Sequence, residues 1–233
     1  MSATATNVLK TVEVTIDVFA DSMPEPLERD LKLLDAWELS RAARFATPVL
    51  RGRYVRSHAL LRRVVAGRIN EDPASLRFER RCEQCGNPTH GRMRLPAMDA
   101  PKFSLSRSGP IAVVACGPGP LGVDVEFESR AHFESEVIFR VSTPVERKRL
   151  MTLSGAARDI AFIEMWTRKE AVVKALGVGL LLPFSSFDVS APGPVVARDG
   201  APPLTVEVFV VSGAHVAVAV SPGRRIDLVG LNH

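Results

Sequence analysis

The sequence has few of the features that mark secreted, membrane-spanning or base-stacking proteins. Its three cysteines among 233 residues are too few and odd in number for a disulfide framework, which agrees with a reducing compartment. No apolar run approaches the roughly 18 residues of a membrane span, and the first residues lack the layout of a signal peptide. The single tyrosine and the absence of interleaved aromatic and basic residues, of the kind that stack bases, weigh against a nucleic-acid partner. We therefore expect a cytoplasmic protein without a membrane or nucleic-acid partner.

The composition is that of a globular protein, with 46% hydrophobic and 24% charged residues. The length suits one large domain or two of about 110 to 120 residues. Gly117-Pro118-Gly119-Pro120 is the best candidate linker, so we predict lobes at 1–117 and 118–233. Both halves run through helices and then antiparallel strands, which predicts an α+β fold and suggests an internal duplication. Helices are expected at 28–34, 37–46, 49–66, 133–140, 144–153 and 157–176, and strands at 12–19, 76–79, 102–106, 111–116, 121–127, 187–190, 204–211 and 215–221.

Charge is distributed unevenly along the chain, although the net charge is only +4. Between residues 41 and 70 there are eight arginines and no aspartate or glutamate. The planar guanidinium suits phosphate, so the candidate partners are a phosphorylated small molecule, nucleic acid or an acidic protein. A solvated helix face in an arginine-rich protein explains the segment equally well at this point.

A short cysteine pair could contribute to a metal site. Cys82 and Cys85 have the spacing of half a zinc knuckle, and His90 could be a third ligand. No second pair completes a tetrahedral set, and the surrounding glycines, asparagine and proline favour a turn-rich surface loop instead.

Two carboxylates stand side by side in LGVDVEF. Asp124 and Glu126 are two residues apart on an expected strand, so both point to the same face. Adjacent carboxylates repel unless a cation lies between them, and Mg²⁺ accepts such oxygens. Chance alternation on a half-exposed sheet is the other interpretation.

A third carboxylate lies in the helical stretch WTRKEAVVKALG. Glu170 and Lys174 are four residues apart and share a helix face, with Lys169 beside them. Such a pair is common on helix surfaces. Here, however, Trp166 precedes Glu170 by one turn, so the charged pair borders the packed side of the helix. This position favours a functional site.

Taken together, the ordered motifs resemble the 4'-phosphopantetheinyl transferases, in particular the large two-lobed kind typified by the surfactin-synthetase activator. The resemblance covers about residues 36 to 190. The motifs that carry it are ARF (43–45), RYVRSHALLR (53–62), HGRMRLP (90–96), FSLSRSG (103–109), GVDVE (122–126) and WTRKEAVVKALGVGL (166–180).

The resemblance implies a fold of two pseudo-symmetric α+β lobes and an Mg²⁺-dependent enzyme, with Mn²⁺ as an alternative metal. Such an enzyme transfers the phosphopantetheine arm of coenzyme A to a serine of an apo acyl or peptidyl carrier protein, in polyketide or nonribosomal peptide biosynthesis. The large type is expected to be a monomer. By similarity, Asp124, Glu126 and Glu170 hold the metal, Glu170 and Lys174 are catalytic, and coenzyme A is bound by Arg41, Arg53, Arg92, Ser106, Arg107, Lys169 and Lys174.

Several positions depart from the family pattern. Arg107 stands where a histidine is usual, Arg92 replaces a lysine, and Val178 removes one cation. The metal and helix residues are intact, so we expect an active enzyme with adjusted coenzyme A contacts. The general base is either Glu170 or a metal-bound water. A coenzyme A-binding pseudoenzyme that docks carrier proteins and a basic nucleic-acid-binding protein are the alternatives.

Overall fold

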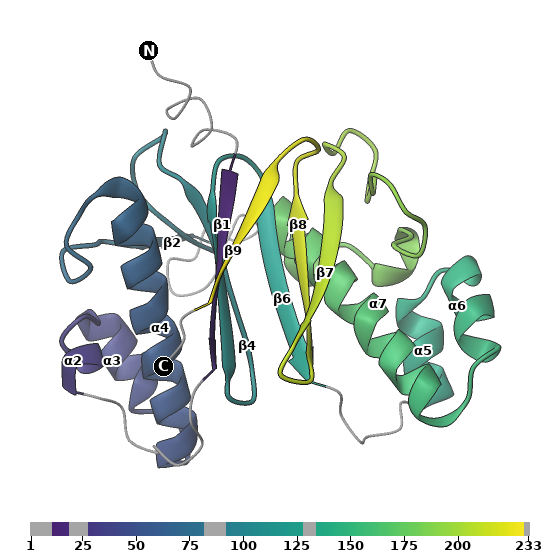
Figure 1. Ribbon diagram of the computed structural model, residues 1–233, viewed down its shortest axis with the longest axis horizontal. Helices are drawn as coiled ribbons and strands as arrows, with labels where there is room; N and C mark the ends of the chain where they lie inside the picture. The colour runs from purple at the N-terminus through teal and green to yellow at the C-terminus, as the bar shows by residue number, and fades with distance from the viewer. Residues whose placement is uncertain (1–10, 19–27, 82–91, 128–133, 231–233) are drawn as a thin grey trace. The chain divides into compact units, whose positions relative to one another are not determined.

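The computed structural model describes residues 11–18, 28–81, 92–127 and 134–230 (Figure 1). The chain splits into two compact units, which we call unit 1 (Met1–Pro118 with Ile226–His233) and unit 2 (Gly119–Arg225). Each contains antiparallel strand pairs and helices, so the predicted α+β class is confirmed. Among the described residues, no helix is long and apolar enough to cross a membrane.

Unit 1 is a four-stranded sheet covered by a long helix. The strand order is β4-β5-β1-β9, with β1 and β4 each antiparallel to β5. Helix α4 packs on β5, and the short helices α2 and α3 pack against α4 (Figure 1). The remaining pair, β2 and β3, forms a separate antiparallel ribbon. The bounds are β1 Thr11–Val18, α2 Glu28–Leu31, α3 Ala36–Ala42, α4 Pro48–Ile69, β2 Glu79–Arg81, β3 Arg92–Arg94, β4 Lys102–Ser108, β5 Ile111–Gly117 and β9 Arg225–Gly230.

Local sequence signals set the ends of α4. The Thr47 hydroxyl accepts a hydrogen bond from the backbone N–H of Leu50, and Pro48 occupies the first turn, where no intrahelical donor is needed. Asn70 adopts a left-handed conformation with φ of 57° and ends the helix. Between these ends, the apolar face packs with strand residues into one core. That core contains Leu60, Leu61, Val64, Val65, Phe103, Ala112, Val114 and Cys116.

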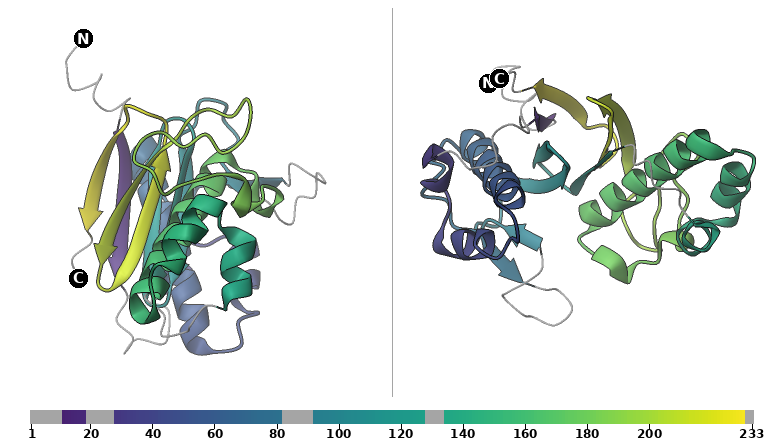
Figure 2. Two further views of the ribbon diagram at one scale, coloured as in Figure 1. Left: turned by 90° about the vertical axis from the view of Figure 1, so that its right-hand side faces the viewer. Right: turned by 90° about the horizontal axis from the view of Figure 1, so that it is seen from below.

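Unit 2 repeats this plan with a three-stranded sheet. The strand order is β6-β8-β7, both pairs are antiparallel, and α7 lies across β6 and β8 (Figures 1 and 2). Its core joins Phe162, Val172, Phe184 and Ala217. The bounds are β6 Leu121–Phe127, α5 Ser135–Val141, α6 Pro144–Met151, α7 Gly155–Leu176, η1 Gly179–Leu181, η2 Phe184–Ser186, β7 Thr205–Val211 and β8 Ala214–Val220.

The strand expected at 187–190 is wrong. That segment follows η2 as an irregular stretch because side chains, and not a neighbouring strand, satisfy its backbone groups. The Glu146 carboxylate accepts from the N–H of Val189, and the Asp188 carboxylate accepts from the N–H of Ser190. The carbonyl of Phe187 accepts from the ammonium of Lys169.

The last strand, β9, was not predicted. Its side chains are mostly exposed and its run of residues is short, so it gives little periodic signal. Because β9 pairs beside β1, the chain from Ile226 belongs to unit 1, whereas the sequence pattern assigned all of 118–233 to the second lobe. Cys82, Cys85 and His90, the weak zinc candidates, lie outside the described residues.

Candidate active site in unit 2

A glycine allows the strand β6 and the helix α7 to approach closely. A Cβ on Gly122 would lie 2.2 Å from the carbonyl oxygen of Ala171 and 2.4 Å from the backbone nitrogen of Ala175. Only glycine fits there. Since side chains alternate along a strand, Asp124 and Glu126 share this face with Gly122 and point toward α7.

Asp124 forms the centre of the site. Its residue is 3% exposed, and its Oδ1 accepts from the ammonium of Lys174 at 2.5 Å. Lys174 lies in the last turn of α7, where the carbonyl ends of the helix favour a cation. The strand and the helix are thereby joined by a mostly buried ion pair.

Glu170 brings a third carboxylate to the same place, one turn before Lys174. Burial raises the pKa of Glu170, and the negative charge of Asp124 raises it further. Lys174 opposes this rise, and Glu126 adds to it. The carboxylates of Asp124 and Glu126 are thus close enough to act electrostatically on Glu170, and the predicted three come together on one side of α7.

Lys169 points elsewhere, which corrects the expectation that it contacts coenzyme A. The side chain is fully buried, and its ammonium donates to the carbonyls of Phe184 at 2.6 Å and Phe187 at 2.5 Å. The ammonium also pairs with the Glu146 carboxylate at 2.8 Å. An ammonium has three protons, and all three have acceptors inside unit 2. Lys169 therefore holds the fold together and is not available to a ligand.

The region that contains these acidic residues matches a known protein family. Residues 120–219 match the model of the 4'-phosphopantetheinyl transferase superfamily. This region is similar to that superfamily. The match contains all three carboxylates and Lys174, so the family resemblance drawn from short motifs is confirmed.

Individual relatives extend the similarity beyond this region. The chain is 30% identical over 159 residues to the 4'-phosphopantetheinyl transferase HetI of a Nostoc species, covering 67% of this chain and 65% of that protein. It is 29% identical to a Bacillus subtilis 4'-phosphopantetheinyl transferase over 56% of this chain and 54% of the relative. It is 24% identical to Sfp of Bacillus subtilis over 71% and 70%. The matches thus span about half to two thirds of the relatives' length.

Among solved structures, the holo-[acyl-carrier-protein] synthase of Thermotoga maritima is similar, with a TM-score of 0.32 and 19% identity. The match covers 43% of this chain and 61% of that one.

The oxygen donors of Asp124, Glu126 and Glu170 are of the type that binds a hard divalent cation. Within the described ranges, no three acidic, histidine or cysteine side chains stand at metal-ligating positions, and the Lys174 ammonium is bonded to one oxygen of Asp124. Yet the mutual charge of Asp124, Glu126 and Glu170 makes their approach costly without a cation. Carboxylate oxygens are the ligands that Mg²⁺ prefers. The three residues therefore fit the metal implied by the family.

Sequence reasoning overlooked His215. It lies on β8 directly opposite Glu126 in the strand register and is 5% exposed. Directly paired residues place their side chains on the same face at close range, so His215 borders the carboxylates. The available signal was a histidine in an otherwise apolar strand, and the pairing needed to interpret it is a long-range feature.

The cations predicted to bind coenzyme A phosphates lie in unit 1. Arg41 is exposed in the last turn of α3, Arg53 is half-buried on α4, and Ser106 is buried on β4. Arg92 donates to the carbonyl of Phe103 at 3.2 Å. The guanidinium of Arg107 lies 5.1 Å from the ring centre of Tyr54 and 5.4 Å from that of Phe45.

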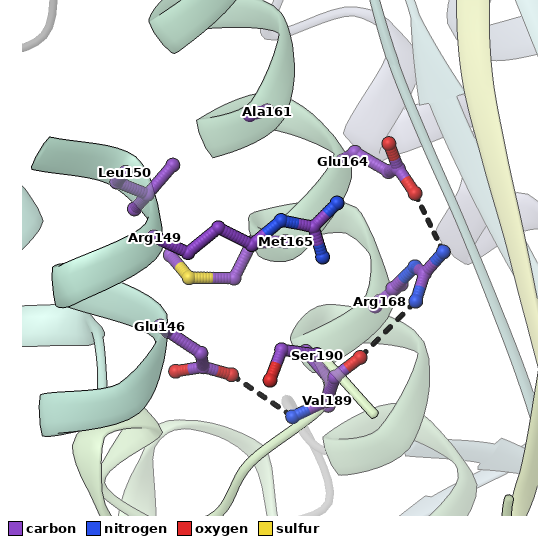
Figure 3. A pocket seen from close by; sticks show the side chains of 9 residues that line it. All are labelled: Glu146, Arg149, Leu150, Ala161, Glu164, Met165, Arg168, Val189 and Ser190. Carbon is purple, nitrogen blue, oxygen red and sulfur yellow. Dashed lines mark hydrogen bonds and ion pairs between the residues drawn. The ribbon is translucent and has the colours of Figure 1, made fainter. Parts of the chain in front are cut away.

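A small cavity in unit 2 lies between α6, α7 and the segment 189–190 (Figure 3). Its volume is about 40 Å³, enough for roughly one water molecule. Arg168 is one of the residues that line it, and its guanidinium donates to Glu164 and to the carbonyl of Val189. None of the predicted site residues lines it, so we assign it to packing between α6 and α7.

Proposed function

We propose that the protein transfers the 4'-phosphopantetheine arm of coenzyme A to a serine of an apo acyl or peptidyl carrier protein. One observation carries the proposal. Asp124, Glu126 and Glu170 converge, with Lys174 beside them, inside the region that matches the 4'-phosphopantetheinyl transferase superfamily. Carboxylates gathered next to a cation suit phosphoryl-transfer chemistry, which relies on positioning and charge neutralisation.

Each acidic residue has a role in this proposal. Asp124, Glu126 and Glu170 would hold Mg²⁺, or Mn²⁺ in its place. The bound metal would neutralise charge that develops on the pyrophosphate oxygens. The Lys174 ammonium would leave the Asp124 carboxylate and donate to the same pyrophosphate. A lysine side chain is flexible and binds phosphate as a point charge.

The reaction joins the serine oxygen of the carrier to the β-phosphorus of coenzyme A. The bond from that phosphorus to the leaving oxygen breaks, and adenosine 3',5'-bisphosphate departs. Glu170 accepts the serine proton, because a serine hydroxyl is too weak an acid to ionise unaided at neutral pH.

In unit 1, we propose that Arg41, Arg53, Arg92, Ser106 and Arg107 contact the nucleotide end of coenzyme A. Their charge would attract a ligand that carries several phosphate groups. Lys169 has no part in this set, because its ammonium is used inside unit 2.

The test is to incubate the protein with Mg²⁺, coenzyme A and an apo carrier protein, and to follow the carrier by mass spectrometry. A gain of one phosphopantetheine supports the proposal, and EDTA should abolish it. Coenzyme A binding without a mass gain would instead identify a pseudoenzyme.

Matched variants on α7 locate the chemistry. We expect Glu170→Gln to lower turnover by about 10²–10⁴-fold, the usual contribution of a positioned proton acceptor. Glu164→Gln removes a carboxylate from the same helix, at its ion pair with Arg168, and should keep turnover near wild type. Equal turnover in both variants and the wild type would contradict the assignment of Glu170.

A further inference from the structure

One histidine of unit 2 lies in the same row of the sheet as a proposed metal ligand. His215 on β8 is paired directly with Glu126 on β6, and two residues along, Ala217 is paired with Asp124. Ala217 belongs to the core that packs against α7, and α7 covers both strands (Figure 1). Because alternate residues of a strand share a face, His215 points to the α7 side of the sheet as well. The imidazole and the carboxylates therefore lie on one face.

His215 has two cross-strand neighbours, and the side chain of only one of them can bond to its ring. On β7 the paired residue is Val210, whose side chain has no polar atom. On β6 it is Glu126, and the Cβ atoms of directly paired residues lie about 4.5–5.5 Å apart, within reach of an imidazole and a carboxylate. His215 is 5% exposed, against 3% for Asp124, and a buried polar ring needs a hydrogen-bond partner. The register thus favours Glu126 as the acceptor of an imidazole N–H.

Glu126 belongs to a cluster of like charges, in which a hydrogen-bond donor has a clear effect. Burial raises the pKa of Glu170, and the charges of Asp124 and Glu126 add to the rise. The ammonium of Lys174 bonds to Asp124. An imidazole has at least one N–H in either protonation state, so His215 can hold Glu126 in a similar way. Carboxylates that bind metals are commonly held by such outer partners, whose loss typically costs about 10–100-fold in metal affinity.

We propose that His215 is a positioning residue of the metal site. Its imidazole donates a hydrogen bond to one carboxylate oxygen of Glu126 and thereby aims the other oxygen at the divalent cation, which Asp124 and Glu170 also bind. The assignment rests on the proposed function, which supplies the cation. It adds to that function a residue that contacts neither coenzyme A nor the carrier serine and acts only through Glu126.

The experiment is a titration of the full chain with Mn²⁺, in which electron paramagnetic resonance measures the free ion and neither coenzyme A nor carrier protein is present. His215→Phe keeps a flat ring but has no N–H, and we expect it to weaken Mn²⁺ binding by about 10–100-fold. His215→Asn and His215→Gln place an amide N–H near one or the other ring nitrogen, so at least one of them should recover most of the affinity. The melting temperature of each metal-free variant checks its folding.

A double variant tests whether His215 acts through Glu126. Glu126→Gln removes the proposed ligand, so adding His215→Phe to it should cause no further loss of Mn²⁺ affinity. Additive losses would overturn the assignment, as would a failure of both amide variants to recover the affinity. His215→Leu, which also lacks an N–H, takes the place of His215→Phe if the latter does not fold.

His58→Phe is the matched control in unit 1. His58 is also a buried histidine beside a glutamate, with its Nδ1 2.8 Å from an oxygen of Glu38. The variant should leave Mn²⁺ affinity unchanged, whatever its effect on the melting temperature. A wild type that binds no Mn²⁺ would overturn the metal site of the proposed function together with this inference. A wild type and a His215→Phe variant that bind Mn²⁺ equally tightly would overturn the inference alone.

Discussion

In unit 1, the short helix α3 begins with a capping box, in which Glu38 at the third position bonds back to the N–H of Asp35. The carboxylate of Glu38 is fully buried and pairs with Arg62 of the 22-residue helix α4. In unit 2, α6 begins in the same way. The Glu146 carboxylate accepts a hydrogen bond from the backbone N–H of Thr143, the residue at the helix N-cap. It also pairs with the buried Lys169 of the 22-residue helix α7.

The parallel extends to the backbone that follows each long helix. Arg62 donates to the carbonyls of Pro73 and Leu76, as Lys169 does to those of Phe184 and Phe187. In each unit, a buried cation on the long helix thus binds both the glutamate of the short helix and the backbone carbonyls of the segment that follows the long helix. This shared device agrees with the internal duplication suggested by the order of elements.

The units differ on the face where each long helix meets its sheet. Unit 2 places Asp124 and Glu126 on β6, against α7 with its Glu170. In unit 1 the strand beneath α4 is β5, IAVVACG, which has no acidic residue. The scaffold is shared, but of these two described strand–helix contacts only the one in unit 2 has the carboxylates that we propose as ligands of a divalent cation. Unit 1 has arginines, which suit the phosphate end of a ligand.

The closeness of strand and helix in unit 2 depends on Gly122. We expect Gly122→Ala to lower the free energy of unfolding by at least about 4 kcal/mol, because the added Cβ would overlap the α7 backbone, which cannot move without repacking the core. Urea denaturation measures this loss.

Gly67→Ala in α4 is the matched control. No atom of the described chain lies within 4 Å of its added Cβ, and the position is exposed inside a helix. This variant should therefore stabilise the protein by up to about 1 kcal/mol. A mild effect of Gly122→Ala would mean that strand and helix are not in tight contact, and that the carboxylates need not converge.

The two buried cations should behave alike. We expect Lys169→Ala and Arg62→Ala each to cost about 3–5 kcal/mol of unfolding free energy, since each leaves a buried glutamate without its partner. Lys174→Ala also leaves a buried carboxylate, that of Asp124, without its partner, but the Lys174 side chain is 31% exposed, so the variant should cost less stability than the other two while impairing transfer. If Lys169→Ala were stable but weak in coenzyme A binding, Lys169 would be a ligand contact after all.

Much of the fold could be predicted from local patterns. The long helices, the β4–β5 and β7–β8 hairpins and the strand β6 show periodic apolar residues between caps or turns, and those signals are contained in a few consecutive residues. The segment 187–190 has the composition of a strand, but its backbone is bonded to Glu146, Lys169 and Asp188. Such distant partners override local propensity.

For the candidate site, too, local patterns predicted one part, and distant contacts decided the rest. Alternation on a strand paired Asp124 with Glu126, and i,i+4 spacing on a helix paired Glu170 with Lys174. Joining the two pairs into one predicted site took the family resemblance. The same spacing cannot tell that Lys169 faces the interior, because neighbouring residues on a helix point about 100° apart. Identifying its role required knowing where Glu146 and the 184–187 segment lie.

The smallest effect that we expect from comparing the two units concerns Glu170. In unit 1, β5, the strand beneath α4, has no acidic residue, so nothing there corresponds to this group of carboxylates. Its pKa is raised by burial and by Asp124, so the folded state favours the protonated form. That stabilisation is present below the pKa of about 4.3 that an unfolded glutamate has, and is lost as pH rises through the higher folded pKa. Near neutral pH without divalent cations, we therefore expect Glu170→Gln to be more stable than the wild type by about 0.5–2 kcal/mol.

Denaturation at several pH values checks this, with Glu164→Gln as control. The advantage of Glu170→Gln should shrink as pH falls and vanish below about pH 4, when Glu170 is protonated in both states. Glu164→Gln removes an ion pair and should gain no stability at neutral pH. Added Mg²⁺ should stabilise the wild type more than Glu170→Gln, since binding to the folded state alone raises its stability. A Glu170→Gln variant less stable than the wild type at neutral pH would mean that Lys174 outweighs the two neighbouring carboxylates.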